Sequence, residues 1–261
     1  MRAIWKGNIV FGLVSIPIKI YTATEERVIE LHNLHSVCHT PLEQKRWCPK
    51  CQKEVPWSEV EKGFKLSKDK WVIIKKEEIE KLKPPSSKNL EIAYFVDVNQ
   101  IDPIYFQKSY YLVPDEGGSK PYSLFVEALR IANKAAIGRL TLRNKEYVVA
   151  LRAYKKGLVA HVLYYKNEIR DINELPELKN LIVVSKEELD LAKVLISQLT
   201  KESFSIDEFK DRYTEALKKL IQSKVEGKEF SLKEEETTTK EAKNLMEALK
   251  ASIEAVKKKK K

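Results

Sequence analysis

The residues best suited to chemistry are three cysteines and a histidine gathered in one short segment. His35 and Cys38 are separated by two residues, Cys48 and Cys51 are also separated by two, and nine residues lie between the two pairs. Two close pairs of nitrogen and sulfur donors joined by a loop are typical of a tetrahedral zinc site. Four protein ligands leave no position for water, so the expected zinc is structural and orders a segment too small to have its own core.

Two alternatives stay open for this segment. Either the cysteines are reduced core residues, or His32 or His39 takes the place of His35 as the fourth ligand. The odd number of cysteines does not fit a disulfide framework and favours a reducing compartment. Because the N-terminus lacks a cleavage pattern and no apolar run reaches about 18 residues, we expect a cytoplasmic protein without a membrane segment.

Basic side chains form the second group, on two expected strands and in the turns after them. They are Arg139, Arg143, Lys145, Arg152, Lys155 and Lys156. Alternate residues of a strand share a face, so several of these cations would line one surface and bind phosphates without reading sequence. The alternative is an ordinary solvated sheet face. Lys65, Lys68 and Lys70 beside Trp71 form a weaker patch, for which a solvated face is the expectation.

The composition favours a polyanionic partner and argues against catalysis. The formal net charge is +10, which favours nucleic acid or an acidic membrane surface. With eight glycines the sequence has no G-x-x-x-x-G-K-[ST] loop and no G-x-G-x-x-G fingerprint, and it also lacks H-E-x-x-H. His161 is expected to be a strand residue and not a catalytic base, so the chain is expected not to be an enzyme.

The elements that must position these residues change character along the chain. Ile16, Ile18 and Ile20 alternate with other residues, as in a half-buried strand, and 136–143, 147–154 and 158–165 are expected to form an antiparallel meander. A helix is expected over 122–134.

After about residue 180 the apolar residues recur with helical spacing. Ser185 with Glu188, and Ser205 with Glu208, each fit a capping box that opens a helix. A last amphipathic helix is expected over 241–256, and five lysines, Lys257 to Lys261, follow it. We expect these lysines to tether the protein to nucleic acid through phosphate contacts.

Segments along most of the chain resemble one known family. The opening MRAIWKG (1–7) and FGLVSIPIKIY (11–21) closely resemble the start of prokaryotic Ku proteins. Further family-like segments run in family order: Leu34-His35, Cys48-Pro49-x-Cys51, Val55-Pro56-Trp57, Phe95-Val96-Asp97, Ile101–Phe106, Tyr110–Asp115, Leu142–Lys145 and Glu168–Asp171. The resemblance covers residues 1–220, and the tail after Gly227 resembles the variable basic extensions of the family.

The resemblance implies an α+β, β-rich fold: a Ku-type β-barrel core with an extended bridge that encircles DNA. Residues 1–180 would form the core, with the zinc segment at 32–57, residues 181–227 its helical part, and 228–261 a linker, helix and lysine-rich tail. Arg139, Arg143, Lys145 and Arg152 would lie where the family's barrel approaches DNA.

The function implied by the resemblance is non-homologous end joining. A homodimeric ring would bind double-stranded DNA ends at the nucleoid and recruit an ATP-dependent end-joining ligase, often fused to a polymerase. Two other classes remain as alternatives: a zinc-ribbon transcription or RNA-binding factor, and a nuclease or ligase subunit with a hidden metal centre.

Overall fold

The structure is a computed structural model that describes residues 1–261 except 69, 83–87, 143–144, 231–244 and 260–261. The chain divides into two compact units, Met1–Arg170 and Asp171–Lys261. The expected three-part division, with boundaries near residues 180 and 227, stays a prediction.

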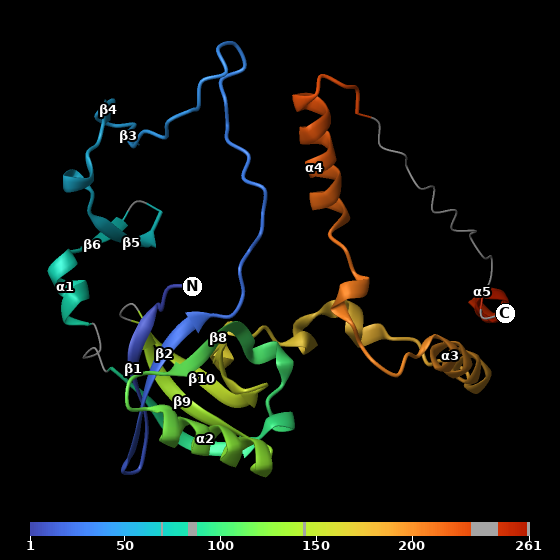
Figure 1. The fold of residues 1–261 in the computed structure, drawn as a ribbon. Helices are drawn as coiled ribbons and strands as arrows, with labels where there is room; N and C mark the ends of the chain where they lie inside the picture. Colours follow the sequence, from blue (N-terminus) through green and yellow to red (C-terminus); the bar gives the residue numbers. More distant parts are fainter. Residues whose placement is uncertain (69, 83–87, 143–144, 231–244, 260–261) are drawn as a thin grey trace. The chain divides into compact units, whose positions relative to one another are not determined.

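The first unit contains a closed β-barrel (Figure 1). Around the barrel the strands follow the order β1 (Trp5–Phe11), β2 (Val14–Thr22), β8 (Phe106–Pro114), β11 (Gly157–Leu163), β10 (Lys145–Tyr154), β9 (Lys134–Leu142) and β7 (Asn89–Asp97). Neighbouring strands are antiparallel except β1 and β7, which close the barrel in parallel with Ile9 opposite Leu90. The expected barrel and the expected β9–β10–β11 meander are confirmed.

The barrel interior is filled by aliphatic side chains at alternate strand positions. Ile16, Ile18 and Ile20 of β2 are fully buried, as their alternation predicted, and Val149 and Leu151 of β10 point into the same core. Because side chains alternate across a strand, the residues between them form the outer face of the barrel.

Helix α2 (Ser119–Ala132) packs across one end of the barrel, and its buried side chains join the barrel core. The hydroxyl of Tyr122 donates a hydrogen bond to the Leu112 carbonyl oxygen at 2.6 Å and accepts one from the Leu158 amide at 2.9 Å. The helix ends at Asn133, whose left-handed backbone (φ 51°) is a common helix stop. Helix α2 therefore ends before Lys134, the last residue of the helix expected from the sequence.

The segment between β2 and β7, residues 23–88, is named here the insert. Its elements are β3 (Trp47–Cys48), β4 (Lys53–Glu54), a 3₁₀ turn (Trp57–Glu59), β5 (Lys62–Ser67), β6 (Lys70–Ile74) and α1 (Lys76–Lys81). β3 pairs with β4 and β5 pairs with β6, each as a separate two-stranded hairpin. None of the described residues of the insert is buried, so this segment has no core of its own.

The second unit contains helices α3 (Lys186–Leu199), α4 (Arg212–Val225) and α5 (Leu245–Lys259). The Ser185–Glu188 capping box is confirmed at the start of α3. The Ser205–Glu208 box is wrong as a helix start: residues 206–208 form a 3₁₀ turn, and α4 begins only at Arg212. The reason is local, since the Asp211 carboxylate accepts a hydrogen bond from the Thr214 amide at 2.9 Å and caps the helix there.

Helix α5 packs against α3 within the second unit, and Ile253 is buried. Its described part begins at Leu245, and residues 241–244 of the expected helix lie outside the described residues. Among the helices in the described part of the chain, none has both the length and the apolar character needed to cross a bilayer.

Candidate nucleic-acid interface

Arg152 is held on the outer face of the barrel by a buried histidine. Its Nε donates a hydrogen bond to His161 Nε2 at 3.0 Å, and His161 Nδ1 lies 2.8 Å from the Ser109 hydroxyl. Burial, and then the charge of Arg152, lower the pKa of His161, so its imidazole is neutral at pH 7. Because a guanidinium only donates, Nε2 must be the acceptor and Nδ1 carries the proton toward Ser109. His161 therefore lies in a strand, as expected, and orients a cation.

The ring of Tyr154, beside Arg152, also contacts a second cation, Lys155. The Arg152 guanidinium carbon lies 5.5 Å from the centre of the Tyr154 ring, and Lys155 Nζ lies 5.6 Å from it. The Tyr154 ring also stacks on Tyr111 of β8, with ring centres 6.1 Å apart. Cations over aromatic faces are attracted by the ring quadrupole. The result is a surface of two cations and two aromatic rings across β8 and β10.

Helix α2 supports the turn that carries Lys155 and Lys156. Lys155 has a left-handed backbone (φ 48°), which is uncommon outside glycine. Its carbonyl oxygen accepts a hydrogen bond from Arg130 of α2, and Arg130 also pairs with Glu127. Both lysine side chains are exposed to solvent.

The other expected cations of the meander lie toward the far end of β10. Arg139 faces two carboxylates, because Glu146 is 3.8 Å away and Glu91 is its partner on β7. Lys145 lies over Tyr147, with Nζ 5.2 Å from the ring centre. Lys145 and Lys155 are separated by the whole length of β10, about 30 Å at the usual rise per residue. The structure thus spreads these cations along a strand and does not bring them into one patch.

Two sets of expected contacts lie wholly or partly outside the described residues. Arg143 lies outside the described residues, as do Lys260 and Lys261. The backbones of Lys257, Lys258 and Lys259 continue helix α5, but the structure does not describe their side chains.

The cysteine segment of the insert contains two turns of the same form. The amide of His39 donates to the carbonyl oxygen of His35, and the amide of Gln52 donates to that of Cys48, both at 2.8 Å. His39 and Gln52 both have left-handed backbones. The first turn brings His35 Nδ1 to 3.0 Å from Cys38 Sγ. Each turn therefore places its first and fourth residues together, as the spacing predicted.

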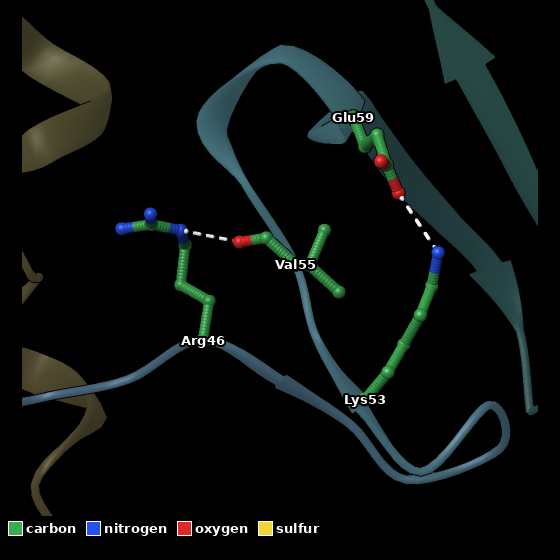
Figure 2. Close-up of polar contacts among 4 residues, drawn as sticks. All are labelled: Arg46, Lys53, Val55 and Glu59. Atoms are coloured by element: carbon green, nitrogen blue, oxygen red, sulfur yellow. Dashed lines mark hydrogen bonds and ion pairs between the residues drawn. The ribbon is translucent and has the colours of Figure 1, made fainter.

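The second turn joins β3 to β4 and is fixed by contacts on its flanks (Figure 2). Arg46 Nε donates to the Val55 carbonyl oxygen at 3.0 Å, and Lys53 Nζ lies 3.3 Å from Glu59 Oε2. The guanidinium carbon of Arg46 also lies 4.3 Å from the centre of the Trp57 ring. These contacts fix the local fold around Cys48 and Cys51 without burying either residue.

Hydrogen bonding lowers the pKa of one thiol in each turn. The Thr40 hydroxyl, followed by His35, lowers the pKa of Cys38 to about 7. Hydrogen bonds from the Cys51 amide and thiol lower that of Cys48, and the Cys48 side chain raises that of Cys51. Thiolates are the form that binds zinc, so each pair fits the metal. The described residues do not, however, bring three or more such donors together at one point.

Sequence reasoning missed the residues that hold the cations in place. Tyr111, Tyr154 and Arg130 are the main ones, and Arg130 contacts a turn 25 positions away in the chain. The interleaving of Arg152, Tyr154 and Lys155 was a local signal for the first part of this arrangement. The contributions of Tyr111 and Arg130 depend on strand register and helix packing.

Comparison with known proteins places the chain in a family. Residues 10–191 match the family model of the Ku70/Ku80 beta-barrel domain. The protein of Heliobacterium modesticaldum called "Non-homologous end joining protein Ku" is 44% identical over 98% of this chain and 93% of its own length. Proteins of the same name from Archaeoglobus fulgidus and Bacillus subtilis are 43% and 37% identical, over 98% and 97% of this chain and 100% and 82% of their own lengths.

The barrel and its full-length relatives define the class, the β-barrel scaffold proteins of non-homologous end joining. Within that class the chain belongs to the Ku family, as its sequence segments implied. Ku proteins are scaffolds and not catalysts, so the expectation that the chain is not an enzyme is confirmed. Family membership also decides against the zinc-ribbon transcription factor and the nuclease or ligase subunit.

Proposed function

We propose that this protein binds the ends of double-stranded DNA without sequence specificity, as a ring-shaped homodimer, in the cytoplasm at the nucleoid. The observation that carries the proposal is the outer surface of β8 and β10, where Arg152 and Lys155 are held over Tyr154. Arginine and lysine oriented in this way contact phosphates, which carry no sequence information. We expect Lys156 to extend this surface, and Arg139, Arg143 and Lys145 to contact phosphates apart from it.

A second copy of the chain is the partner that the exposed apolar residues favour. Ile182 and Val183 are 90% and 94% exposed, and Phe204 is 80% exposed. Large apolar side chains exposed to this extent are typical of an interaction surface. In solution, light scattering should give twice the 30.2 kDa chain mass.

The DNA-end proposal is tested by comparing linear and closed circular duplexes of one sequence. A protein that threads onto ends binds the linear form far more tightly, loads several copies on longer fragments, and loses affinity steeply as salt rises. Equal affinity for closed circles would overturn it. Adding magnesium to the same samples checks that neither cleavage nor joining occurs.

The five C-terminal lysines add a sequence-independent tether in this proposal. Because α5 packs on α3, deleting the helix would disturb the fold, so the better test replaces Lys257 to Lys261 with glutamine. The variant should keep its preference for ends while its affinity and salt slope fall, by at most about 0.9 in slope per lysine. Unchanged affinity at low salt would show that the tail does not contact DNA.

Two further components complete the proposal. His35, Cys38, Cys48 and Cys51 would hold a structural zinc, supported by the paired donors of the two turns and by the lowered pKa of one thiol in each turn. When bound, the metal would join the two turns of a segment that has no core. The partner recruited to the bound end is an ATP-dependent end-joining ligase, supported by the end-joining names of the relatives.

A further inference from the structure

We propose that the β5–β6 hairpin of the insert binds unpaired bases at DNA overhangs, with Trp71 as a stacking platform and the adjacent lysines as phosphate ligands. This inference deepens the proposed function, because an overhang reaches the hairpin only if the protein binds DNA ends. It gives a binding function to the patch around Lys65, Lys68, Lys70 and Trp71, which the sequence alone predicts to be ordinary solvated surface.

The indole of Trp71 is held against the neighbouring strand. Trp71 is the cross-strand partner of Lys65, and Ile73, on the same face, is the partner of Gly63. A methyl group built on Gly63 would lie only 3.3 Å from Trp71 Cε3. The ring thus lies over the one residue of β5 that has no side chain, while 59% of Trp71 remains exposed. A ring positioned before binding loses little freedom when a base stacks on it.

One lysine lies beside the ring, and three more lie on the same hairpin. Lys65 Nζ lies 5.9 Å from the centre of the Trp71 ring. Between residues 62 and 74 the sequence contains Lys62, Lys65, Lys68 and Lys70 against a single acidic residue, Asp69. The side chains of Lys65 and Lys70 are exposed. Lysines beside an exposed aromatic ring match a ligand that has both phosphates and flat bases.

A ring with an adjacent lysine favours unpaired nucleotides over the two other possible ligands of this surface, duplex DNA and a second copy of the chain. A duplex presents phosphates, but its base faces are stacked inside, so Trp71 would gain nothing from them. An apolar surface of a second copy would cover Trp71 but would also take the lysine charges out of water without a partner. Aromatic platforms with flanking cations are the usual means of binding single strands without sequence preference, because every base has a flat face.

Trp57 of the same insert provides the contrast. It is more exposed than Trp71, at 73%. One face of its ring, however, is already covered by the Arg46 guanidinium, 4.3 Å from the ring centre. A base that stacks on this face would have to displace the closely placed guanidinium, whereas Lys65 Nζ lies farther from the Trp71 ring, at 5.9 Å. Trp57 therefore serves as the matched control.

The test compares a blunt duplex with the same duplex carrying an overhang of about six nucleotides, using full-length protein. The wild type should bind the overhang about tenfold more tightly, the order expected for one base stacked on an aromatic ring. Trp71→Leu should remove this preference and leave blunt-end affinity unchanged, whereas Trp71→Tyr and Trp57→Leu should both keep it. Lys65→Gln should lower the salt slope for the overhang by about 0.7.

The possible results distinguish a failure of this inference from a failure of the proposed DNA-end binding. If the wild type binds blunt and overhanging ends equally, or if Trp71→Leu keeps the preference with an unchanged circular dichroism spectrum, the platform is wrong and end binding stands. If Trp57→Leu removes the preference as fully as Trp71→Leu, the platform is also wrong. If the wild type binds closed circles as tightly as linear DNA, the proposed function itself fails.

Discussion

The barrel and the insert differ in what holds them together. The barrel buries ten large side chains almost completely, among them Ile9, Leu90 and Leu140, around one continuous core. The insert buries none of its described residues, although Phe64, Leu66 and Trp71 are as large and apolar as those of the barrel. An isolated two-stranded hairpin is at best marginally stable in water. The barrel is therefore stabilised by its core, whereas the insert depends on local contacts within its hairpins and turns.

The largest expected effect is a cavity in the barrel. Leu140→Ala should lower the free energy of unfolding by about 2–5 kcal/mol, because Leu140 is fully buried and the removed volume cannot be refilled. Leu66→Ala in the insert, where Leu66 is 58% exposed, is the matched control and should change it by less than about 0.5 kcal/mol. Urea unfolding of both variants measures the contrast, and equal losses would show that the insert contributes to the core.

A single hydroxyl should have the next largest effect. Tyr122→Phe leaves the buried Leu112 carbonyl and Leu158 amide without the hydroxyl that joins them, at a cost of about 1–3 kcal/mol. Tyr165→Phe is the control, because the Tyr165 hydroxyl also donates to a carbonyl, that of Glu146, but at the surface. A melting temperature that falls by the same amount in both variants would contradict the assigned role of Tyr122.

In the insert the largest effect should come from changes at the proposed zinc ligands. Cys48→Ser is expected to abolish zinc binding and to destabilise the insert, seen as faster proteolysis of residues 23–88, while the barrel unfolds as before. His35→Asn should act alike, and His32→Asn and His39→Asn should not. Metal analysis that finds no zinc in the wild type, together with unchanged proteolysis of Cys48→Ser, would refute the site.

The smallest expected effect is a pH dependence of the barrel. The folded-state pKa of His161 is lowered, so the unfolded chain takes up a proton first as the pH falls below about 6.5. Stability from the neutral imidazole is thus complete above that pH and declines below it, by less than about 1.4 kcal/mol per pH unit. His161→Gln should lose less stability between about pH 7 and pH 5. If the free energy of unfolding of the two proteins changes with pH in the same way, His161 is not neutral in the folded protein.

The sequence predicts a feature of the fold well when residues close together in the chain determine it, and poorly when residues far apart in the chain do. The alternation of Ile16, Ile18 and Ile20 and the Ser185–Glu188 box were readable because a few adjacent residues determine them. The parallel pairing of Ile9 with Leu90 was not, since it joins strands separated by the whole insert. The start of α4 was misplaced because Ser205–Glu208 and Asp211 are competing caps in one short stretch, and Asp211 forms the cap.

The candidate sites follow the same rule. The cysteine turns were predicted from spacing alone, because residues separated by two others meet within a single turn. The grouping of cations was predicted less well, since strand register places Arg139 beside Glu91 and Glu146 and leaves Arg152 beside His161. The placement of the Trp71 ring depends on the absence of a side chain at Gly63, across the hairpin.

The attachment of the insert has a consequence for protein engineering. Its first end follows Thr22 of β2 and its second precedes Asn89 of β7, and both strands flank β1. Thr22 lies two residues beyond Ile20, the partner of Trp5, whereas Asn89 is the partner of Asn8. This offset along β1 and two interstrand spacings across it together amount to about 20 Å, a gap that a linker of about eight residues spans. Replacing residues 23–88 with such a linker should yield a minimal barrel that folds alone, since each halving of a closed loop relieves about 0.6 kcal/mol of chain entropy.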